Sequence, residues 1–270
     1  MRLQNDQLEK LVETVLSSSK YKDVSQDLIR SIGMRELAKR SSIKEAVKAT
    51  KNKLHQVGGA YLTEREDYTG WFKVLEHHFR SGDQDAFLAS VKKMMGYHAS
   101  TRERLPILEQ FYTTILADLP PIRRVLDLAC GFNPLALPWM PLTESVEYYA
   151  YDIYKDMLSF LEQFMALIQV QGQVQVCDIV QACPTMQVDL AFVLKAIPCL
   201  EQIDKSAGSQ LLHSINAKYI VVSFPVHSLG GRTKGMEANY EAKFGSLVEN
   251  TTWSIKKFEF PTELVFLLIK

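Results

Sequence analysis

The sequence has few cysteines and no long apolar run. Its four cysteines, Cys130, Cys177, Cys183 and Cys199, have neither metal-ligand spacing nor a disulfide framework, so we expect reduced thiols and no metal site. No apolar stretch approaches the roughly 18 residues that a membrane-spanning helix needs, and residues 1–16 lack the apolar segment of a secretory signal. These absences predict a cytoplasmic protein without a membrane partner.

The glycine-rich G-x-G-x-x-G motif is also missing, which excludes the usual pyrophosphate cradle of dinucleotide-binding domains. Apolar residues make up 47% of the 270-residue chain and charged residues 23%, which is enough for a packed core in an ordinary globular protein.

Charge is balanced overall but unevenly distributed. The chain has 31 basic and 31 acidic residues, yet residues 1–110 hold 19 basic against 15 acidic, and residues 111–270 hold 12 against 16. The excess is concentrated in residues 30–53, with eight basic and two acidic side chains. This asymmetry predicts an electrostatic docking surface joined to a second functional unit.

The first 95 residues have the periodicity of helices. Apolar residues recur at three- and four-residue spacing over residues 8–15 and 43–54, and Ser41 or Ser42 can cap the second of these helices. We predict a helical domain over residues 1–95. Further helices are predicted over residues 67–80, 84–95 and 101–116.

After Pro120-Pro121, short apolar runs typical of buried strands alternate with helical stretches, which predicts a parallel doubly wound sheet. Only Pro261-Thr262 separates the last two runs, so these strands should pair antiparallel. Five alternating strands closed by an antiparallel hairpin is the layout of the Rossmann-like S-adenosylmethionine (SAM)-dependent methyltransferase fold. We therefore predict an α/β domain with a seven-stranded sheet over residues 96–270. The seven runs are RRVLDLA, VEYYAYD, QVQVCDIV, VDLAFVLKAI, KYIVVSFPV, WSIKKFEF and ELVFLLI.

The stretch VLDLACGFNPLAL (residues 125–137) ends the first strand in a loop with a single glycine. Asp127 can accept hydrogen bonds from loop amides, and the small residues Ala129 and Gly131 let the backbone approach a ligand closely. Because SAM has no phosphate, one glycine is sufficient. The loop by itself also fits an ordinary strand-to-helix turn.

Two further acids follow the next strands. Asp152 ends the second strand, where a carboxylate can take both ribose hydroxyls, and Asp178 follows the third, where it can accept from an adenine amino group. Either acid alone could instead cap a helix. Three acids at the ends of three successive strands favour a SAM site.

The target of the methyl group should be encoded after the fourth strand, in VLKAIPCLE. No Asp/Asn-Pro-Pro-aromatic motif is present, which argues against methylation of an exocyclic amine. Pro198-Cys199 leaves open a cytosine-C5 reaction through a thiolate, although Cys199 could simply be a small apolar residue at a helix start. Guanine N7 would need no general base, because its lone pair can attack the methyl group directly.

Residues 223–244, SFPVHSLGGRTKGMEANYEAKF, contain a glycine-rich basic loop that leads into a helix starting near Met236. Arg232 and Lys234 could hold phosphates beside an extruded base, or the loop could be exposed with incidental charge.

These motifs together identify a family resemblance. The chain resembles the 16S rRNA guanine-N7 methyltransferases that confer aminoglycoside resistance, and the resemblance extends over most of the chain from about residue 50. It implies methyl transfer to N7 of guanine 1405 in the decoding site of the assembled 30S ribosomal subunit, with a helical amino-terminal domain that docks on the rRNA. The motifs that carry it are GAYLT, HASTRERL, RRVLDLACGFNPLAL, LKAIPCLE and SFPVHSLGGRTKGMEANY.

The resemblance also implies roles for individual residues around the cofactor. Arg104 should pair with the carboxylate of SAM, and Lys195 should lie at the mouth of the target pocket. The methionine moiety is assigned to Ala129 and Gly131, the ribose to Asp152, and the adenine to Asp178 with Ile179. His98, Asp127, Ile153 and Lys195 complete the predicted cofactor-binding residues.

No residue is expected to act as an acid or base, so catalysis would consist of positioning by Lys195, Arg232 and Met236. His227 stands where the family has Lys or Arg and would be a weaker phosphate contact at neutral pH. Any two or three of the amino-terminal basic residues could simply be solvated. The RNA-binding candidates are Lys20, Arg40, Lys44, Lys48, Lys51, Lys53, His227, Arg232, Lys234 and Met236.

The resemblance thus predicts a monomeric, cytoplasmic enzyme that flips its target base and forms no covalent intermediate. Two alternatives remain at this stage: an RNA cytosine-C5 methyltransferase that uses Cys199, and a non-catalytic ribosome-binding protein with the SAM fold.

Overall fold

The computed structural model describes residues 2–59, 61, 67–226 and 236–270. Eleven α-helices and seven strands occur in this part of the chain. The helices are α1 (Arg2–Leu16), α2 (Gln26–Leu37), α3 (Ile43–Leu54), α4 (Tyr68–Ser81), α5 (Gln84–Met95), α6 (Ala99–Arg104), α7 (Leu108–Leu116), α8 (Lys155–Leu167), α9 (Ile197–Ile203), α10 (Ala207–Ser214) and α11 (Met236–Leu247). The strands are β1 (Arg124–Leu128), β2 (Glu147–Asp152), β3 (Gln171–Val176), β4 (Val188–Leu194), β5 (Ala217–Pro225), β6 (Ser254–Phe260) and β7 (Glu263–Ile269).

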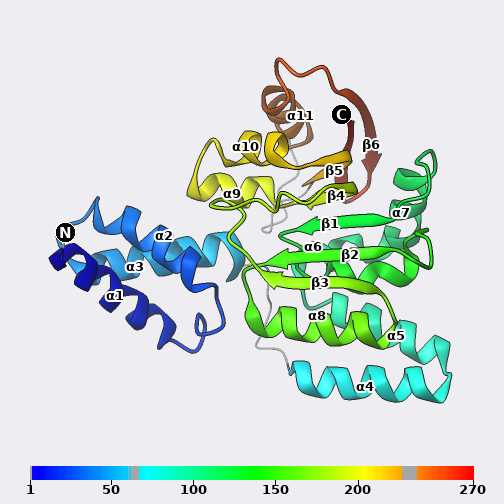
Figure 1. Ribbon diagram of the computed structural model, residues 1–270, viewed down its shortest axis with the longest axis horizontal. Helices are drawn as coiled ribbons and strands as arrows, with labels where there is room; N and C mark the ends of the chain where they lie inside the picture. Colours follow the sequence, from blue (N-terminus) through cyan, green and yellow to red (C-terminus); the bar gives the residue numbers. More distant parts are fainter. Residues whose placement is uncertain (1, 60, 62–66, 227–235) are drawn as a thin grey trace.

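The seven strands form one sheet in the order β3-β2-β1-β4-β5-β7-β6 (Figure 1). Strands β1 to β5 pair in parallel, and β7 runs antiparallel to both β5 and β6. All seven predicted strands are confirmed, and so is the terminal hairpin. The chain order reverses between β1 and β4, so their carboxyl ends flank the place where ligands bind in such sheets.

Burial along the strands follows their position in the sheet. The central strand β4 is buried along nearly its whole length, as a strand covered by helices on both faces must be. The edge strands β3 and β6 instead expose most of their residues, and β6 carries Lys256 and Lys257 toward solvent. Charged side chains on an edge discourage pairing with another sheet.

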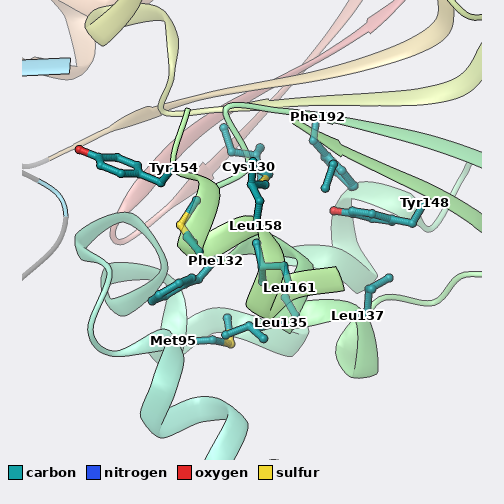
Figure 2. Packing of buried hydrophobic residues seen from close by; sticks show 14 of the residues in the cluster. Met95, Cys130, Phe132, Leu135, Leu137, Tyr148, Tyr154, Leu158, Leu161 and Phe192 are labelled. Atoms are coloured by element: carbon teal, nitrogen blue, oxygen red, sulfur yellow. The ribbon is translucent and has the colours of Figure 1, made fainter. Parts of the chain in front are cut away.

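Two cores lie on the two faces of the sheet, because successive strand residues point to opposite faces. Val125 of β1 belongs to the core that α5, α7 and α8 cover, whereas Leu126 and Leu128 belong to the core beneath α9, α10 and α11. Figure 2 shows the first core from close by, with Leu158 and Leu161 of α8 packed near Phe132.

Helix starts follow capping chemistry. Ser42 caps α3 by accepting from the backbone N of Glu45 at 3.3 Å, and Asp67 and Asp83 cap α4 and α5 in the same way. The start of α11 at Met236 also agrees with the prediction.

Two helix predictions need correction. The single helix predicted over residues 101–116 is wrong: Pro106 lies in a 3-10 turn, η2 (Leu105–Ile107), that separates α6 from α7. Proline lacks the N–H that would continue the helix. Helix α2 was not predicted, although Ser25 caps it and its apolar residues have helical spacing.

Helices α4 and α5 pack on α8 and on the segment that follows β1 (Figure 1). The ring of Tyr68 stacks on Phe160 of α8 at a centroid distance of 5.4 Å, and Trp71 meets Phe132 edge-on at 5.8 Å. Both helices fall in the domain predicted over residues 1–95, yet they share a core with the domain predicted to begin at residue 96. The boundary at residue 95 stays a prediction.

Helices α1, α2 and α3 form a separate layer, which we call the amino-terminal unit (residues 2–54). It lies beside the carboxyl ends of β1 to β3, away from α4 and α5 (Figure 1). Leu11 and Val15 of α1 are fully buried against Ile29 of α2. Within the described part of the chain, no helix has the length and apolar character needed to cross a bilayer.

The packing of α4 leads to a first prediction. Replacing Trp71 with Ala should lower the free energy of unfolding of the whole protein by about 3 kcal/mol, because the indole contacts Phe132 and Phe160 of the sheet layer. Urea unfolding measures this change. The control is Val74→Ala on the same helix, where the side chain is 44% exposed and the expected change is below about 0.5 kcal/mol. An unchanged unfolding midpoint for Trp71→Ala would show that α4 does not share the core of the sheet.

Candidate functional site

A crevice of about 750 Å³ opens at the carboxyl ends of β1, β2 and β4, where the strand order reverses. Seven of the residues predicted to contact the cofactor line it. They are His98, Ala129, Asp152, Ile153, Asp178, Ile179 and Lys195.

Asp152 joins two loops at the base of this crevice. Its Oδ2 accepts from the backbone N of Gly131 at 2.9 Å, and its Oδ1 accepts from the backbone N of Ile153 at 2.6 Å. Burial raises the pKa of this carboxyl, and the backbone amides oppose the rise. Each oxygen keeps a lone pair, so the carboxylate can still accept from a pair of hydroxyl groups.

Asp178 has a carboxylate oxygen without a protein partner. Its Oδ1 accepts from the backbone N of Val180 at 3.1 Å, whereas Oδ2 is buried and has no hydrogen bond to any described residue. Buried polar atoms are nearly always satisfied, so an orphaned oxygen in a crevice wall suits a donor group of a ligand. Burial raises the pKa of this carboxyl as well.

The loop after β1 needs left-handed backbone. Ala129 and Gly131 have φ values of 52° and 50°. A Cβ on Gly131 would lie 2.8 Å from Cε1 of His98, so only glycine lets the loop approach this ring so closely. The loop backbone therefore packs directly against His98, and Ala129 lines the crevice.

His98 forms part of the wall of the same crevice and carries no charge. Its ring lies next to the rings of Tyr61 and Phe132, at centroid distances of 6.0 and 5.5 Å. Burial lowers the pKa of His98 to about 3, with further lowering by the nearby charges of Lys195 and Arg104. The imidazole is therefore neutral at physiological pH.

Three predicted cofactor residues do not line the crevice. Gly131 donates its backbone N–H to Asp152, whereas Arg104 and Asp127 lie in a buried network behind the wall. Arg104 donates to Glu263 through Nη2 at 2.6 Å and Nε at 3.1 Å, and to Oδ1 of Asn133 at 2.9 Å. A contact between Arg104 and a ligand carboxylate stays a prediction, since it would require the guanidinium to share its donors.

Asp127 is held by its own partners in this network. Its Oδ2 accepts from the hydroxyl of Tyr148 at 2.6 Å and from Nδ2 of Asn133 at 3.0 Å. Burial raises the pKa of Asp127 to about 6, although both hydrogen bonds favour the charged form.

Glu263 is the residue that sequence reasoning missed. It opens β7, is fully buried, and faces both Arg104 and the Nζ of Lys195, the latter at 3.3 Å from Oε2. Burial alone would raise its pKa, but the two cations outweigh this and hold the pKa below its ordinary value. The available signal was an acid at the start of the apolar run ELVFLLI, where no charge is expected without a partner.

Lys195 lines the crevice, but its ammonium points into this network. Nζ donates to Oε2 of Glu103 at 2.8 Å and to the carbonyl of Ser100 at 3.2 Å. Its backbone φ of 55° is in the left-handed region, which is uncommon for a residue with a side chain. The direction of Lys195 is therefore set by Glu103 and Glu263.

Cys199 also lines the crevice, with its Sγ 2.9 Å from the hydroxyl of Tyr61. Burial raises the pKa of this thiol more than the hydrogen bond with Tyr61 lowers it. A nucleophilic cysteine needs the thiolate, so the geometry does not support the cytosine-C5 alternative.

The predicted RNA-binding residues are in different surroundings. Lys44 and Lys48 are exposed on α3 and form no ion pair with any described residue, whereas Arg40 is paired with Glu36. The remaining amino-terminal candidates are Lys20, whose Nζ lies 3.1 Å from Nδ1 of His55, Lys51, which is half-buried, and Lys53, which donates to the carbonyl of Gln202 at 2.9 Å. Met236 is the first residue of α11, and His227, Arg232 and Lys234 lie outside the described residues.

The sheet order, the terminal hairpin, the single-glycine loop and the two crevice acids define a Rossmann-like methyltransferase. Comparison with known proteins is more specific. A family model described as "Ribosomal RNA methyltransferase (FmrO)" matches residues 17–267. The chain belongs to this family.

Relatives named "16S rRNA (guanine(1405)-N(7))-methyltransferase" match almost the entire chain. The protein from Frankia casuarinae is 38% identical over 98% of this chain and 94% of its own length. The protein from Serratia marcescens is 36% identical over 95% of this chain and 96% of its own. The resemblance inferred from the motifs is therefore confirmed.

Two solved structures have the same fold throughout. The 16S rRNA methyltransferase RmtF, in complex with S-adenosyl-L-homocysteine, superposes with a TM-score of 0.83 at 29% identity and covers 98% of both chains. The 16S rRNA methylase RmtB superposes with a TM-score of 0.80 at 30% identity, covering 97% of this chain and 98% of its own.

The buried network leads to a second prediction. Glu263→Gln should lower the free energy of unfolding by about 3 kcal/mol at pH 7, because it leaves Arg104 and Lys195 buried without their shared carboxylate. Glu263 has a lowered pKa, so its stabilising effect is present above its ordinary value of 4.5 and is lost as pH falls through the native value. Urea unfolding at pH 7 and at roughly pH 3.5 should show the difference from wild type shrinking at the lower pH.

The matched control is Glu259→Gln on β6, whose exposed side chain pairs with Lys257 and should contribute little at either pH. If the free energy of unfolding of Glu263→Gln at pH 7 equalled that of the control variant, the carboxylate of Glu263 would not be stabilising the charges of Arg104 and Lys195.

Proposed function

We propose that this protein transfers a methyl group from SAM to N7 of guanine 1405 in 16S rRNA and thereby confers resistance to aminoglycosides. The observation that carries the proposal is the pair of crevice acids, Asp152 and Asp178, at the ends of β2 and β3 in a chain of the ribosomal RNA methyltransferase family. Relatives with near-complete coverage are named for this reaction.

The two crevice acids offer acceptors that suit the adenosine of SAM. The orphaned Oδ2 of Asp178 can accept from the adenine amino group, and Asp152 can accept from the ribose hydroxyls. The methionine moiety would follow the backbone of Ala129 toward the neutral ring of His98. RmtF, a relative of the same fold, was solved in complex with S-adenosyl-L-homocysteine. The cofactor supplies an electrophilic methyl group on a sulfonium.

The residues around the crevice support a reaction that needs no general base. With its pKa lowered to about 3, His98 is a weak proton acceptor, and Cys199 is held as a thiol, so neither supplies a general base or a thiolate nucleophile. The ring lone pair of guanine N7 requires no deprotonation, and alignment with the methyl group is sufficient. Apolar side chains such as Ile153 and Leu200 exclude water from the cofactor.

The amino-terminal unit would dock on rRNA. Exposed Lys44 and Lys48 on α3 can approach phosphates, whereas Arg40 and Lys53 already have protein partners. We further propose that the substrate is the assembled 30S subunit and that residues 1–95 form the docking region. The enzyme would act as a monomer in the cytoplasm. A methyl group at N7 adds bulk and positive charge, which opposes cationic drugs at the decoding site.

The central experiment maps the methylated base. Incubation of 30S subunits with the protein and SAM, followed by borohydride and aniline treatment, should cleave 16S rRNA at guanine 1405, because N7 methylation labilises the glycosidic bond. Absence of this cleavage would contradict the proposal. The variant Cys199→Ser should give the same cleavage, since the thiol forms no bond to the base.

The adenine contact is tested by cofactor binding. Asp178→Asn should bind S-adenosyl-L-homocysteine roughly tenfold more weakly, because a charge-assisted hydrogen bond worth about 1.5 kcal/mol is weakened. Isothermal titration calorimetry measures the dissociation constant. Asp156→Asn is the control: Asp156 also accepts from a backbone amide, that of Met157 at 2.9 Å, but does not line the crevice. Equal affinities for the two variants would remove Asp178 from the site.

The docking surface is tested by salt dependence. Lys44→Ala combined with Lys48→Ala should weaken binding to 30S subunits and reduce the slope of log affinity against log salt by about 2, because each lysine would neutralise one phosphate. Filter binding at several salt concentrations measures both. The control removes the same charge at the other end of the sheet, through Lys218→Ala with Lys256→Ala. A slope reduced equally by both double variants would point to a non-specific charge effect.

A further inference from the structure

Residues of the amino-terminal unit and of the turn that follows it form one wall of the cofactor crevice. Leu28 of α2 lines the crevice and is only 2% exposed. Val57 and Gly58 line it from the π-helical turn η1 (His55–Gly59), which continues directly from α3. They share this crevice with Ile153 and Asp178, which the proposed function assigns to the cofactor.

The unit is fastened to the loop that follows Asp152. The backbone N of Ser25 donates to the carbonyl of Ile153 at 2.7 Å, and the backbone N of Lys155 donates to the carbonyl of Asp23 at 2.8 Å. Between these two bonds lies an antiparallel bridge of Val24 with Tyr154. The segment that enters α2 is therefore paired with the loop that leaves the ribose-binding end of β2.

The turn η1 approaches the same loop closely. A Cβ on Gly58 would lie 2.8 Å from the hydroxyl oxygen of Tyr154 and 3.1 Å from Cδ1 of Ile153. The β2 loop is thus contacted by the amino-terminal unit before α2 and by the turn η1 after α3.

Side chains fasten the unit to two further segments of the crevice. Nε2 of Gln181, in the loop of Asp178, donates to Oγ of Ser31 at 2.8 Å. Nη1 of Arg35 donates to the carbonyl of Ile203 at 2.9 Å, and Ile203 itself lines the crevice. Three segments that line the cofactor site are therefore held by α2 and the residues that lead into it.

We propose that the amino-terminal unit is a structural part of the cofactor site, so that cofactor binding and rRNA docking are energetically coupled through it. This inference rests on the proposed function. The adenosine of SAM would contact Leu28 as well as the loops of Asp152 and Asp178, and so stabilise the closed arrangement of unit and sheet. A substrate that contacts Lys44 and Lys48 while its base enters the crevice needs the same arrangement.

Coupling of this kind is reciprocal. If both ligands favour one arrangement, each raises the affinity of the protein for the other by the same factor. The cofactor would therefore be held most tightly when the protein is on its substrate, and the protein without cofactor would dock more weakly.

The first test uses S-adenosyl-L-homocysteine alone and two arginines of α2. Arg35→Ala removes the bond to Ile203 and the ion pair with Asp204, and should weaken binding at least roughly fivefold. Arg30→Ala removes the same charge from the same helix, but its partner is Glu9 within the unit, so binding should stay within about twofold of wild type. Titration calorimetry with the full chain measures both. Equal affinities of the two variants would overturn the inference.

A second pair tests the wall itself. Leu28→Ala should weaken binding of S-adenosyl-L-homocysteine more than Ile32→Ala, because both side chains are 2% exposed in the same core but only Leu28 lines the crevice. Equal weakening by the two variants would count against the contact. If these core variants do not fold, the arginine pair still decides.

The reciprocal effect is measured on 30S subunits. Saturating S-adenosyl-L-homocysteine should raise the affinity of the wild-type protein for 30S subunits at least roughly fivefold, and Arg35→Ala should abolish most of this gain. An unchanged wild-type affinity would contradict the coupling. The calorimetric tests contain no ribosome, so they report on the cofactor site alone. If Arg35→Ala and Leu28→Ala weaken cofactor binding as expected but guanine 1405 is not methylated, the proposed function is refuted and the assignment of the crevice wall still holds.

Discussion

The carboxylate of Asp152 connects the parts of the molecule on which the site depends. One oxygen holds the backbone of Gly131 after β1, and the other holds the backbone of Ile153 after β2. The carbonyl of Ile153 in turn accepts from Ser25 at the entry to α2. A single buried charge therefore sets the relative positions of the β1 loop, the β2 loop and the amino-terminal unit. Its burial is tolerated because amides satisfy it from both sides.

A second buried cluster supports the crevice from behind. Arg104 and Lys195 meet at Glu263, with Glu103 as a further partner of Lys195. Buried ion pairs contribute little net stability against an apolar alternative, but removal of one member is costly. The cluster thus defines orientation more than stability: it holds the ammonium of Lys195 in the network and the guanidinium of Arg104 behind the crevice wall. Local patterns contain no information about such a cluster, because its members come from α6, from β7 and from the residue that follows β4.

Much of the architecture follows from local sequence. The seven strands, the terminal hairpin and the starts of α3, α4, α5 and α11 agree with periodicity and capping, since these depend on residues a few positions apart. The error at Pro106 was avoidable, because proline breaks a helix wherever it lies in the interior. Six of the seven predicted cofactor residues that line the crevice lie at or just after a strand end, because the carboxyl ends of parallel strands must meet at one edge of the sheet. The placement of Arg104 and Asp127 behind the wall, and the packing of α4 on α8, could not be predicted in this way.

The sequence by itself determined the order of the strands along the chain and the single-glycine loop. It also determined the three acids near the strand ends, which are Asp127 in β1, Asp152 in β2 and Asp178 after β3. These properties depend on side-chain period and on backbone freedom at individual residues, which are local. Only the tertiary structure decided which charges face the crevice and which neutralise one another, and that α2 with the turn after α3 closes the cofactor site. Those outcomes depend on distances between residues far apart in the chain, and such distances are set by packing of the completed fold.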